Sequence, residues 1–166
     1  MKLKTLYRKS VLFRVNHLYA GWNNYEHKRK LLNRAGFDIG EGTKVVGPFY
    51  CSAKLKVGRN CWIGKNFMGN GNGSIAIGDC CDIGPEVIFQ TGTHEIGDEH
   101  RRAGKGIICS QNVGNGVWIG GRSTFIGDVE IADSSIIAGC SCVVCDVSDN
   151  VLVGGVPAKV IRKLKA

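Results

Sequence analysis

The sequence predicts an all-β solenoid, in which short strands wind into stacked coils. An apolar residue recurs every six positions along most of the chain, and the fourth residue after it is often small or apolar. Positions i and i+4 lie on the same side of an extended strand, so this pattern favours strands and excludes a helix. The periodic positions are Ile39, Val45, Cys51, Val57, Ile63, Ile77, Ile83, Phe89, Val113, Ile119, Phe125, Ile131, Ile137 and Val143.

Glycine use supports the same fold. The 166 residues include 24 glycines and only 3 prolines, without the Gly-X-Y period of collagen. Regular tight turns need such glycines. If three six-residue units complete a coil, residues eighteen positions apart stack, and no unit buries its apolar face alone. With one long insertion left out, the expected columns are Ile77, Val113 and Ile131; Ile83, Ile119 and Ile137; and Phe89, Phe125 and Val143.

Two helices are expected before the repeats, over residues 2–22 and about 25–35, where Gly36 suits a C-terminal cap. Lys4, Arg8 and Arg14 flank or intrude on the apolar stripe of the first helix. Packing against the body or a neighbouring subunit is therefore favoured over contact with a membrane surface. The stripe consists of Leu3, Tyr7, Val11, Val15, Leu18 and Trp22.

The basic character of the chain lies entirely in this N-terminal segment. Residues 1–35 hold nine Lys or Arg and one Glu, whereas residues 36–166 hold thirteen residues of each sign, so the formal net charge of +8 belongs to the first 35 residues. A neutral repeat region argues against nucleic-acid binding, which needs a basic stripe along the fold. Peripheral contact of the basic segment with the inner face of an anionic membrane stays open as an alternative.

A cytoplasmic protein is expected, because no apolar run reaches the length of a membrane span and Arg14 breaks the stretch that a signal peptide would need. In that compartment the eight cysteines are expected to be reduced thiols. Cys142 and Cys145 form a CxxC pair, but no second pair or nearby histidine accompanies it, and the repeat frame already explains both positions. No metal site is expected.

A long polar excursion, predicted for residues 95–112, interrupts the repeats after FQTGTH at Phe89–His94. Polar loops at the edge of a rigid scaffold often carry function. His94 stands where the excursion begins. Histidine suits general-base catalysis because its unperturbed pKa lies near neutrality.

The sequence resembles the hexapeptide-repeat acyltransferases through VWIG, GGVPAKVIR and TGTHEIG, over about residues 39–162. It is similar to sugar O-acetyltransferases of the maltose and galactoside type and of capsule and exopolysaccharide clusters. The resemblance implies a left-handed parallel β-helix, a homotrimer and acetyl-CoA as co-substrate. It further implies direct acetyl transfer to a saccharide hydroxyl, in surface polysaccharide biosynthesis.

The resemblance also implies catalytic roles. His94 occupies the place of the family's general base, at the end of the strand before the protruding loop. Glu95 either orients the imidazole or contacts acceptor or solvent. Asn70 matches the first asparagine of an Asn-x-Asn motif that contacts the reacting groups, and Asn72 is expected to bind substrate. The glycines interleaved in FMGNGNGS depart from that motif, so a plain wide turn is an equal alternative.

Acetyl-CoA is expected in a groove between coils of two subunits. Gly121 and Gly139 match positions of backbone contact, while Lys159 and Arg162 match residues that meet the coenzyme phosphates, whose charge they suit. Residues 144–145, Val and Cys, replace the Thr-Lys pair that is usual in the family.

The excursion carries Arg101, Arg102 and Lys105 beside the expected acceptor site. Arg101 and Arg102 are candidate substrate-binding residues for an anionic or nucleotide-linked sugar, with a solvated loop as the alternative. Cys109 could accept acetyl covalently in principle, but the resemblance implies direct transfer.

The expected organisation is an N-terminal helical appendage (1–36), a β-helix (37–152) and a C-terminal coenzyme-binding segment (153–166). Three alternatives share the fold: a serine or amino-sugar N-acetyltransferase, a γ-type carbonic anhydrase and a non-catalytic scaffold. The short N-terminal region counts against a serine acetyltransferase. A carbonic anhydrase needs three metal-binding histidines, and only His94 and His100 lie in the repeat region.

Overall fold

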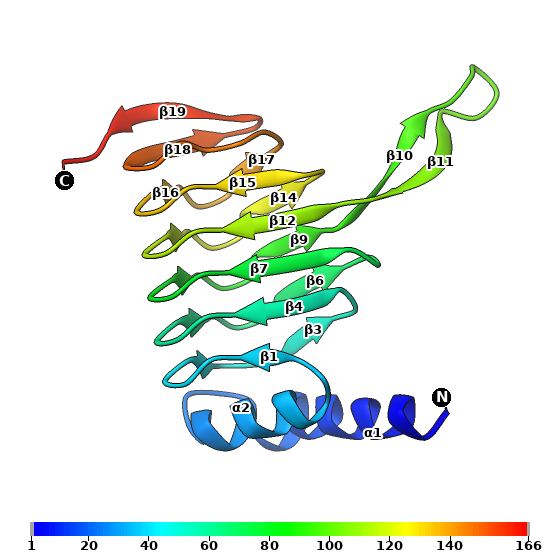
Figure 1. The fold of residues 1–166 in the computed structure, drawn as a ribbon, viewed down its shortest axis with the longest axis vertical. Helices are drawn as coiled ribbons and strands as arrows, with labels where there is room; N and C mark the ends of the chain where they lie inside the picture. Colours follow the sequence, from blue (N-terminus) through cyan, green and yellow to red (C-terminus); the bar gives the residue numbers. More distant parts are fainter. Residues whose placement is uncertain (1, 166) are drawn as a thin grey trace.

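The computed structural model describes residues 2–165, with side chains from residue 5. Its body is a parallel β-solenoid in which the chain visits three sheets in turn, coil upon coil (Figure 1). Sheet A contains β1 (Asp38–Ile39), β4 (Lys54–Val57), β7 (Ser74–Ile77), β12 (Ser110–Val113) and β15 (Val129–Ile131). Sheet B contains β2 (Lys44–Val45), β5 (Trp62–Ile63), β8 (Asp82–Ile83), β13 (Trp118–Ile119), β16 (Ile136–Ile137), β18 (Val151–Gly155) and β19 (Ala158–Lys163). Sheet C contains β3 (Phe49–Cys51), β6 (Phe67–Asn70), β9 (Ile88–Gln90), β14 (Thr124–Ile126) and β17 (Cys142–Val143).

The stacking columns predicted from the six-residue period are confirmed. Val113 pairs with Ile77 and Ile131 on sheet A, and Ile119 pairs with Ile83 and Ile137 on sheet B. On sheet C, Phe125 pairs with Phe89 and Val143. All fourteen periodic residues are buried, so every coil contributes to one continuous apolar core.

An aromatic column runs through this core along sheet C. The rings of Phe49 and Phe67 stack at 5.4 Å between centroids, and those of Phe89 and Phe125 stack at 4.6 Å. Gly69 fills the repeat position between these pairs, because a Cβ there would lie 2.7 Å from the Cys51 sulfur. Gly69 keeps the six-residue period after Ile63, and the two-residue slip falls after it, in the turn of residues 71–73 between β6 and β7.

The N-terminal segment contains two helices, but the first is shorter than expected. Helix α1 spans Lys2–Phe13 and continues as a π-helical turn, η1 (Arg14–Leu18), whereas α2 (Tyr25–Arg34) ends at the predicted cap, with Gly36 at φ +92°. The predicted stripe was wrong in part. Val11 and Val15 pack into the core as expected, but Tyr7, Leu18 and Trp22 are exposed. The π-turn changes the helical period ahead of Leu18, and the helical segment ends before Trp22, whereas Tyr7 lies in α1 before that turn. The Leu3 side chain is outside the described residues.

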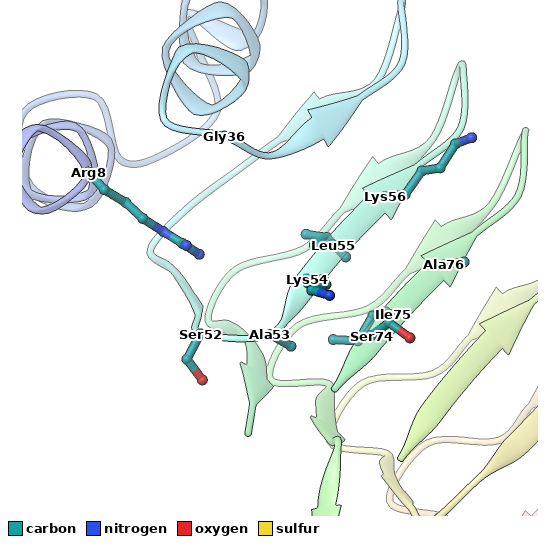
Figure 2. A pocket seen from close by; sticks show the side chains of 10 residues that line it. All are labelled: Arg8, Gly36, Ser52, Ala53, Lys54, Leu55, Lys56, Ser74, Ile75 and Ala76. Carbon is teal, nitrogen blue, oxygen red and sulfur yellow. The ribbon is translucent and has the colours of Figure 1, made fainter. Parts of the chain in front are cut away.

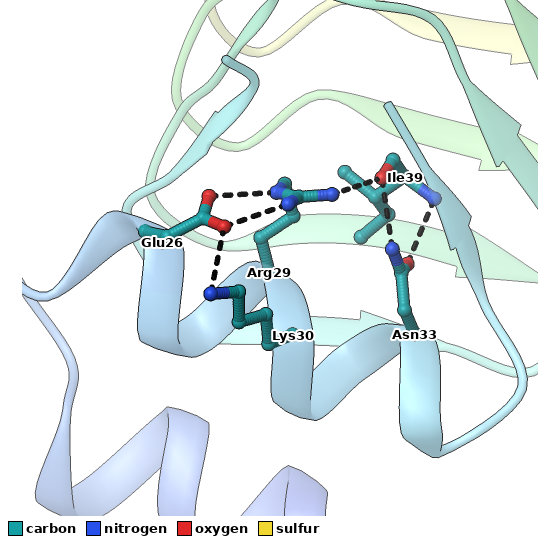
Figure 3. Close-up of polar contacts among 5 residues, drawn as sticks. All are labelled: Glu26, Arg29, Lys30, Asn33 and Ile39. Atoms are coloured by element: carbon teal, nitrogen blue, oxygen red, sulfur yellow. Dashed lines mark hydrogen bonds and ion pairs between the residues drawn. The ribbon is translucent and has the colours of Figure 1, made fainter. Parts of the chain in front are cut away.

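This segment caps the first coil on all three sheets. On sheet A, Asn33 donates to the Ile39 carbonyl (2.9 Å) and accepts from the Ile39 amide (2.8 Å), a contact that Arg29 joins in Figure 3. On sheet C, Asn16 makes the same two bonds to Phe49 (3.1 and 2.8 Å). Exposed strand edges recruit other chains, so these side chains close off the end of the solenoid.

On sheet B the capping group is the buried ammonium of Lys28. It donates to the carbonyls of Gly21 (2.7 Å) and Val46 (2.8 Å) and lies 4.9 Å from the centre of the Tyr25 ring. Burial lowers the pKa of Lys28 to about 8. Lys28, one of the cations of the basic N-terminal segment, thus stabilises the fold.

The opposite end of the solenoid is closed by strand β19, which folds back antiparallel on β18 at the edge of sheet B. Within residues 2–165, no helix is long and apolar enough to cross a membrane. The division into segments 1–36, 37–152 and 153–166 stays a prediction.

Candidate active site

The excursion is an ordered β-hairpin. Strands β10 (Gly92–Ile96) and β11 (Ala103–Ile108) pair antiparallel and leave the solenoid where the chain turns from sheet C to sheet A, which we call the C–A corner (Figure 1). Pairing begins at Gly92, ahead of the predicted start at residue 95, and the chain is back on sheet A at Ser110. The two strands form a sheet of their own, separate from the three sheets of the solenoid.

His94 lies on β10 close to the base of this hairpin, and its side chain is exposed. Its cross-strand partner is Gly106, which has no side chain to cover the imidazole. The register shifts directly after His94, between His94 and Ile96. Such irregularities are frequent beside active sites, where they redirect a side chain. An exposed imidazole is accessible to an acceptor hydroxyl, which is a requirement for a general base.

Asn70 reaches the same corner from the coil below. It ends β6, where it pairs with Gln90, and it is followed by the wide turn Gly71–Gly73. A Cβ on Gly73 would clash with the carbonyl oxygen of Cys109, so the glycine is required where the turn passes under the hairpin. The structure therefore brings the Asn70 turn and the base of the His94 hairpin together.

Thr91 holds these two parts in place. Its hydroxyl donates to the Asn70 carbonyl (2.8 Å) and accepts from the Gly73 amide (3.1 Å), while its own amide donates to Asn70 as well (2.8 Å). Its carbonyl accepts from the Cys109 amide (3.0 Å), at the returning end of the hairpin. Thr91 was not among the residues predicted from the sequence. It lies two positions after Phe89, so an extended chain points both side chains into the core, and the Thr91 side chain is fully buried there.

The remaining predicted acceptor residues are spread along the hairpin and the turn. Glu95 follows His94 on β10 and Asn72 lies in the Gly71–Gly73 turn, both exposed. Arg101 and Arg102 lie in the hairpin tip, which Figure 1 shows projecting away from the coils. The structure thus places Asn70, Asn72, His94 and Glu95 near one corner and separates the two arginines from it.

Cys109 is buried under the corner and is unsuited to covalent catalysis. Burial, with a smaller contribution from the Asp128 carboxylate, raises the pKa of its thiol, so the reactive thiolate is disfavoured. Nearby, the buried Gln111 amide donates to the carbonyls of Gln90 and Gly127 (3.0 Å each). These contacts tie together the coils on either side of the hairpin.

The residues predicted to bind the coenzyme lie away from the C–A corner, in two different places. Gly121 and Gly139 lie one coil apart where the chain turns from sheet B to sheet C, and the Gly121 carbonyl accepts from the Cys140 amide (2.9 Å). Lys159 and Arg162 are exposed on β19, paired with Gly154 and Leu152. Gly121 and Gly139 thus lie at a corner different from that of His94, whereas Lys159 and Arg162 lie on the last strand of sheet B.

The structure offers no alternative metal centre in the part of the chain that it describes: no three His, Cys, Asp or Glu side chains are placed to hold one ion. His100 lies at the hairpin tip, with its Nε2 3.7 Å from a carboxylate oxygen of the neighbouring Glu99.

Comparison with known proteins gives the family. The galactoside O-acetyltransferase of Escherichia coli (strain K12) is 32% identical over 167 residues, which cover 97% of this chain and 79% of the relative. A hexapeptide-repeat acetyltransferase from Vibrio cholerae O1 biovar eltor, solved with acetyl coenzyme A, superposes with a TM-score of 0.81 at 30% identity, over 99% of this chain and 89% of that one. A galactoside acetyltransferase solved with coenzyme A gives a TM-score of 0.77 at 26% identity, over 99% and 82%. No protein-family model matches the chain.

The chain belongs to the hexapeptide-repeat acetyltransferases of the galactoside O-acetyltransferase type. The predicted fold, a left-handed parallel β-helix with an N-terminal helical segment and a protruding loop, is confirmed. The prediction of an acyltransferase is confirmed as well, and the predicted co-substrate is the one bound in the Vibrio cholerae relative.

Proposed function

We propose that this protein transfers acetyl from acetyl-CoA to a hydroxyl of a saccharide, in the biosynthesis of a surface polysaccharide, with His94 as the general base. The observation that carries the proposal is the exposed imidazole of His94 on a hairpin whose base Thr91 joins to the Asn70 turn. The imidazole takes the proton of the acceptor hydroxyl while that oxygen attacks the thioester carbonyl. The C–S bond then breaks, and the imidazolium gives the proton to the departing sulfur, so that coenzyme A leaves as the thiol. The buried Cys109 leaves direct transfer as the preferred route.

A homotrimer belongs to this proposal. His94 stands at the C–A corner, whereas Gly121 and Gly139 lie at the turn from sheet B to sheet C. These corners are different edges of one solenoid, so a neighbouring copy is needed to bring a coenzyme site against the histidine. Light scattering tests this point, and a monomer with full activity would contradict it. Contact of the basic N-terminal segment with an anionic membrane stays a separate prediction.

The test of the catalytic role is His94→Ala, assayed by release of coenzyme A with a panel of galactosides, maltose, amino sugars and serine. We expect kcat to fall by about 10²- to 10⁴-fold, the usual share of a general base, with coenzyme affinity little changed. His100→Ala is the matched control, since it removes an exposed imidazole from the tip of the same hairpin. Near-normal turnover of His94→Ala on the best acceptor would refute the assignment, and transfer confined to amino groups would refute O-acetylation.

A further inference from the structure

A pocket of about 300 Å³ lies between helix α1 and the outer face of sheet A (Figure 2). Three cations line it, Arg8 from α1 and Lys54 and Lys56 from β4, and none of its lining residues is acidic. The volume is at the lower end of the range for small-molecule sites. The pocket is therefore large enough and basic enough to take an anionic group.

The Arg8 guanidinium is already fixed in position. It lies 4.5 Å from the centre of the Phe37 ring and donates one N–H to the Cys51 carbonyl (3.0 Å). A guanidinium carries five N–H groups, so donors remain for a ligand. Because the side chain is half-buried and held on two sides, less conformational entropy is lost when an anion binds.

Lys54 and Lys56 alternate with buried residues along β4, so both lysine side chains point outward from sheet A. Their neighbours on β7 are the short side chains of Ser74 and Ala76, which leave the hollow between the strands open. Lys56 also stands opposite Asp38 of β1, but no ion pair joins them. In Figure 2 the Lys56 side chain extends away from Arg8, so Arg8 and Lys54 are the cations placed to meet an anion in the pocket.

The pocket adjoins the corner that carries the candidate active site. The Ser52 hydroxyl at its edge donates to the Gly71 carbonyl (3.0 Å) and accepts from the Gly71 amide (3.1 Å), in the turn after Asn70. The Ser74 hydroxyl bonds to that of Ser110 (3.0 Å), where the chain returns from the hairpin. A ligand that fills the pocket therefore lies alongside the Asn70 turn.

We propose that this pocket binds the phosphate or diphosphate of a phosphorylated saccharide, so that the acceptor is an anionic glycosyl ester held by Arg8 and Lys54. The identity of the ligand as acceptor rests on the proposed function; the binding of phosphate by this pocket does not. Nucleotide-linked and lipid-linked saccharides share this chemistry.

The first experiment measures binding of inorganic diphosphate by calorimetry, with coenzyme A saturating so that the coenzyme site is filled. We expect Arg8→Gln and Lys54→Gln each to raise Kd by about tenfold, the effect of one charge-assisted contact. Lys65→Gln, which removes an exposed cation from a turn outside the pocket, is the control and should leave Kd unchanged. Lys54 is exposed on the strand, so its variant keeps the test valid if Arg8→Gln does not fold.

Two further arms identify the source of the phosphate: uridine diphosphate glucose, and phosphatidylcholine vesicles with or without phosphatidic acid. Weaker binding of Arg8→Gln and Lys54→Gln to the nucleotide sugar supports a nucleotide-linked acceptor, and weaker binding to the phosphatidic acid vesicles supports a lipid-linked one. Wild-type affinity of the Arg8→Gln, Lys54→Gln double variant for diphosphate would overturn the proposal. Full turnover by His94→Ala would instead overturn the proposed function and leave these binding results standing.

Discussion

The corner that positions His94 depends on one hydroxyl, and Thr91→Val tests it with little change of side-chain volume. The substitution removes a donor to Asn70 (2.8 Å) and an acceptor for the Gly73 amide (3.1 Å). The Asn70 carbonyl keeps its bond from the Thr91 amide, but the amide of the buried Gly73 loses its only recorded partner among the described residues. A buried donor left unpaired costs about 1 to 3 kcal/mol, so the free energy of unfolding should fall by that amount.

Urea unfolding followed by tryptophan fluorescence measures this loss. Thr124→Val is the matched control, because the half-buried Thr124 hydroxyl makes no hydrogen bond to a described residue, and a surface change of this kind should stay within about 0.5 kcal/mol. Thr91→Ser, which keeps the hydroxyl, should retain most of the hydrogen-bond contribution.

The same variant has a kinetic consequence. A displacement of the Asn70 turn relative to the hairpin misplaces groups that must meet the acceptor, so kcat should fall by about ten- to a hundredfold while the KM for acetyl-CoA stays constant. A Thr91→Val enzyme with wild-type stability and wild-type kcat would refute the view that this hydroxyl holds the two parts of the site together.

Two more predictions concern the coenzyme and the thiol. Lys159→Ala and Arg162→Ala should raise the KM for acetyl-CoA more than that for its dephospho form, because the cations suit the extra phosphate; equal effects on both donors would mean that they do not contact it. Cys109→Ala should keep kcat within about twofold, since burial disfavours the thiolate that covalent transfer requires; loss of turnover in a folded variant would restore the covalent route.

The six-residue period was enough to predict the coils and their stacking, because in a solenoid each residue packs on its equivalent one coil away. The columns through Val113, Ile119 and Phe125 could therefore be assigned by counting, with only the insertion removed. The break in the period between Phe89 and Val113 also located the insertion. The choice of His94 and Asn70 as a pair came from motif resemblance, and their shared corner then followed from the order of the strands.

Other features depend on contacts that no local pattern contains. The capping roles of Asn16, Lys28 and Asn33 arise because these side chains meet strand edges up to 33 residues away. The predicted helical stripe extended too far because a π-turn changes the helical period after Phe13.

The sequence by itself thus determined the fold class, the core, the family and the candidate base, all of which are expressed in short-range periodicity and motifs. Only the tertiary structure decided how the corner is held, through Thr91, and where the basic pocket lies, through Arg8 and β4. The reason is physical: a hydrogen bond or a charge cluster is defined by distances between atoms, and segments distant along the chain acquire those distances only when the coils stack.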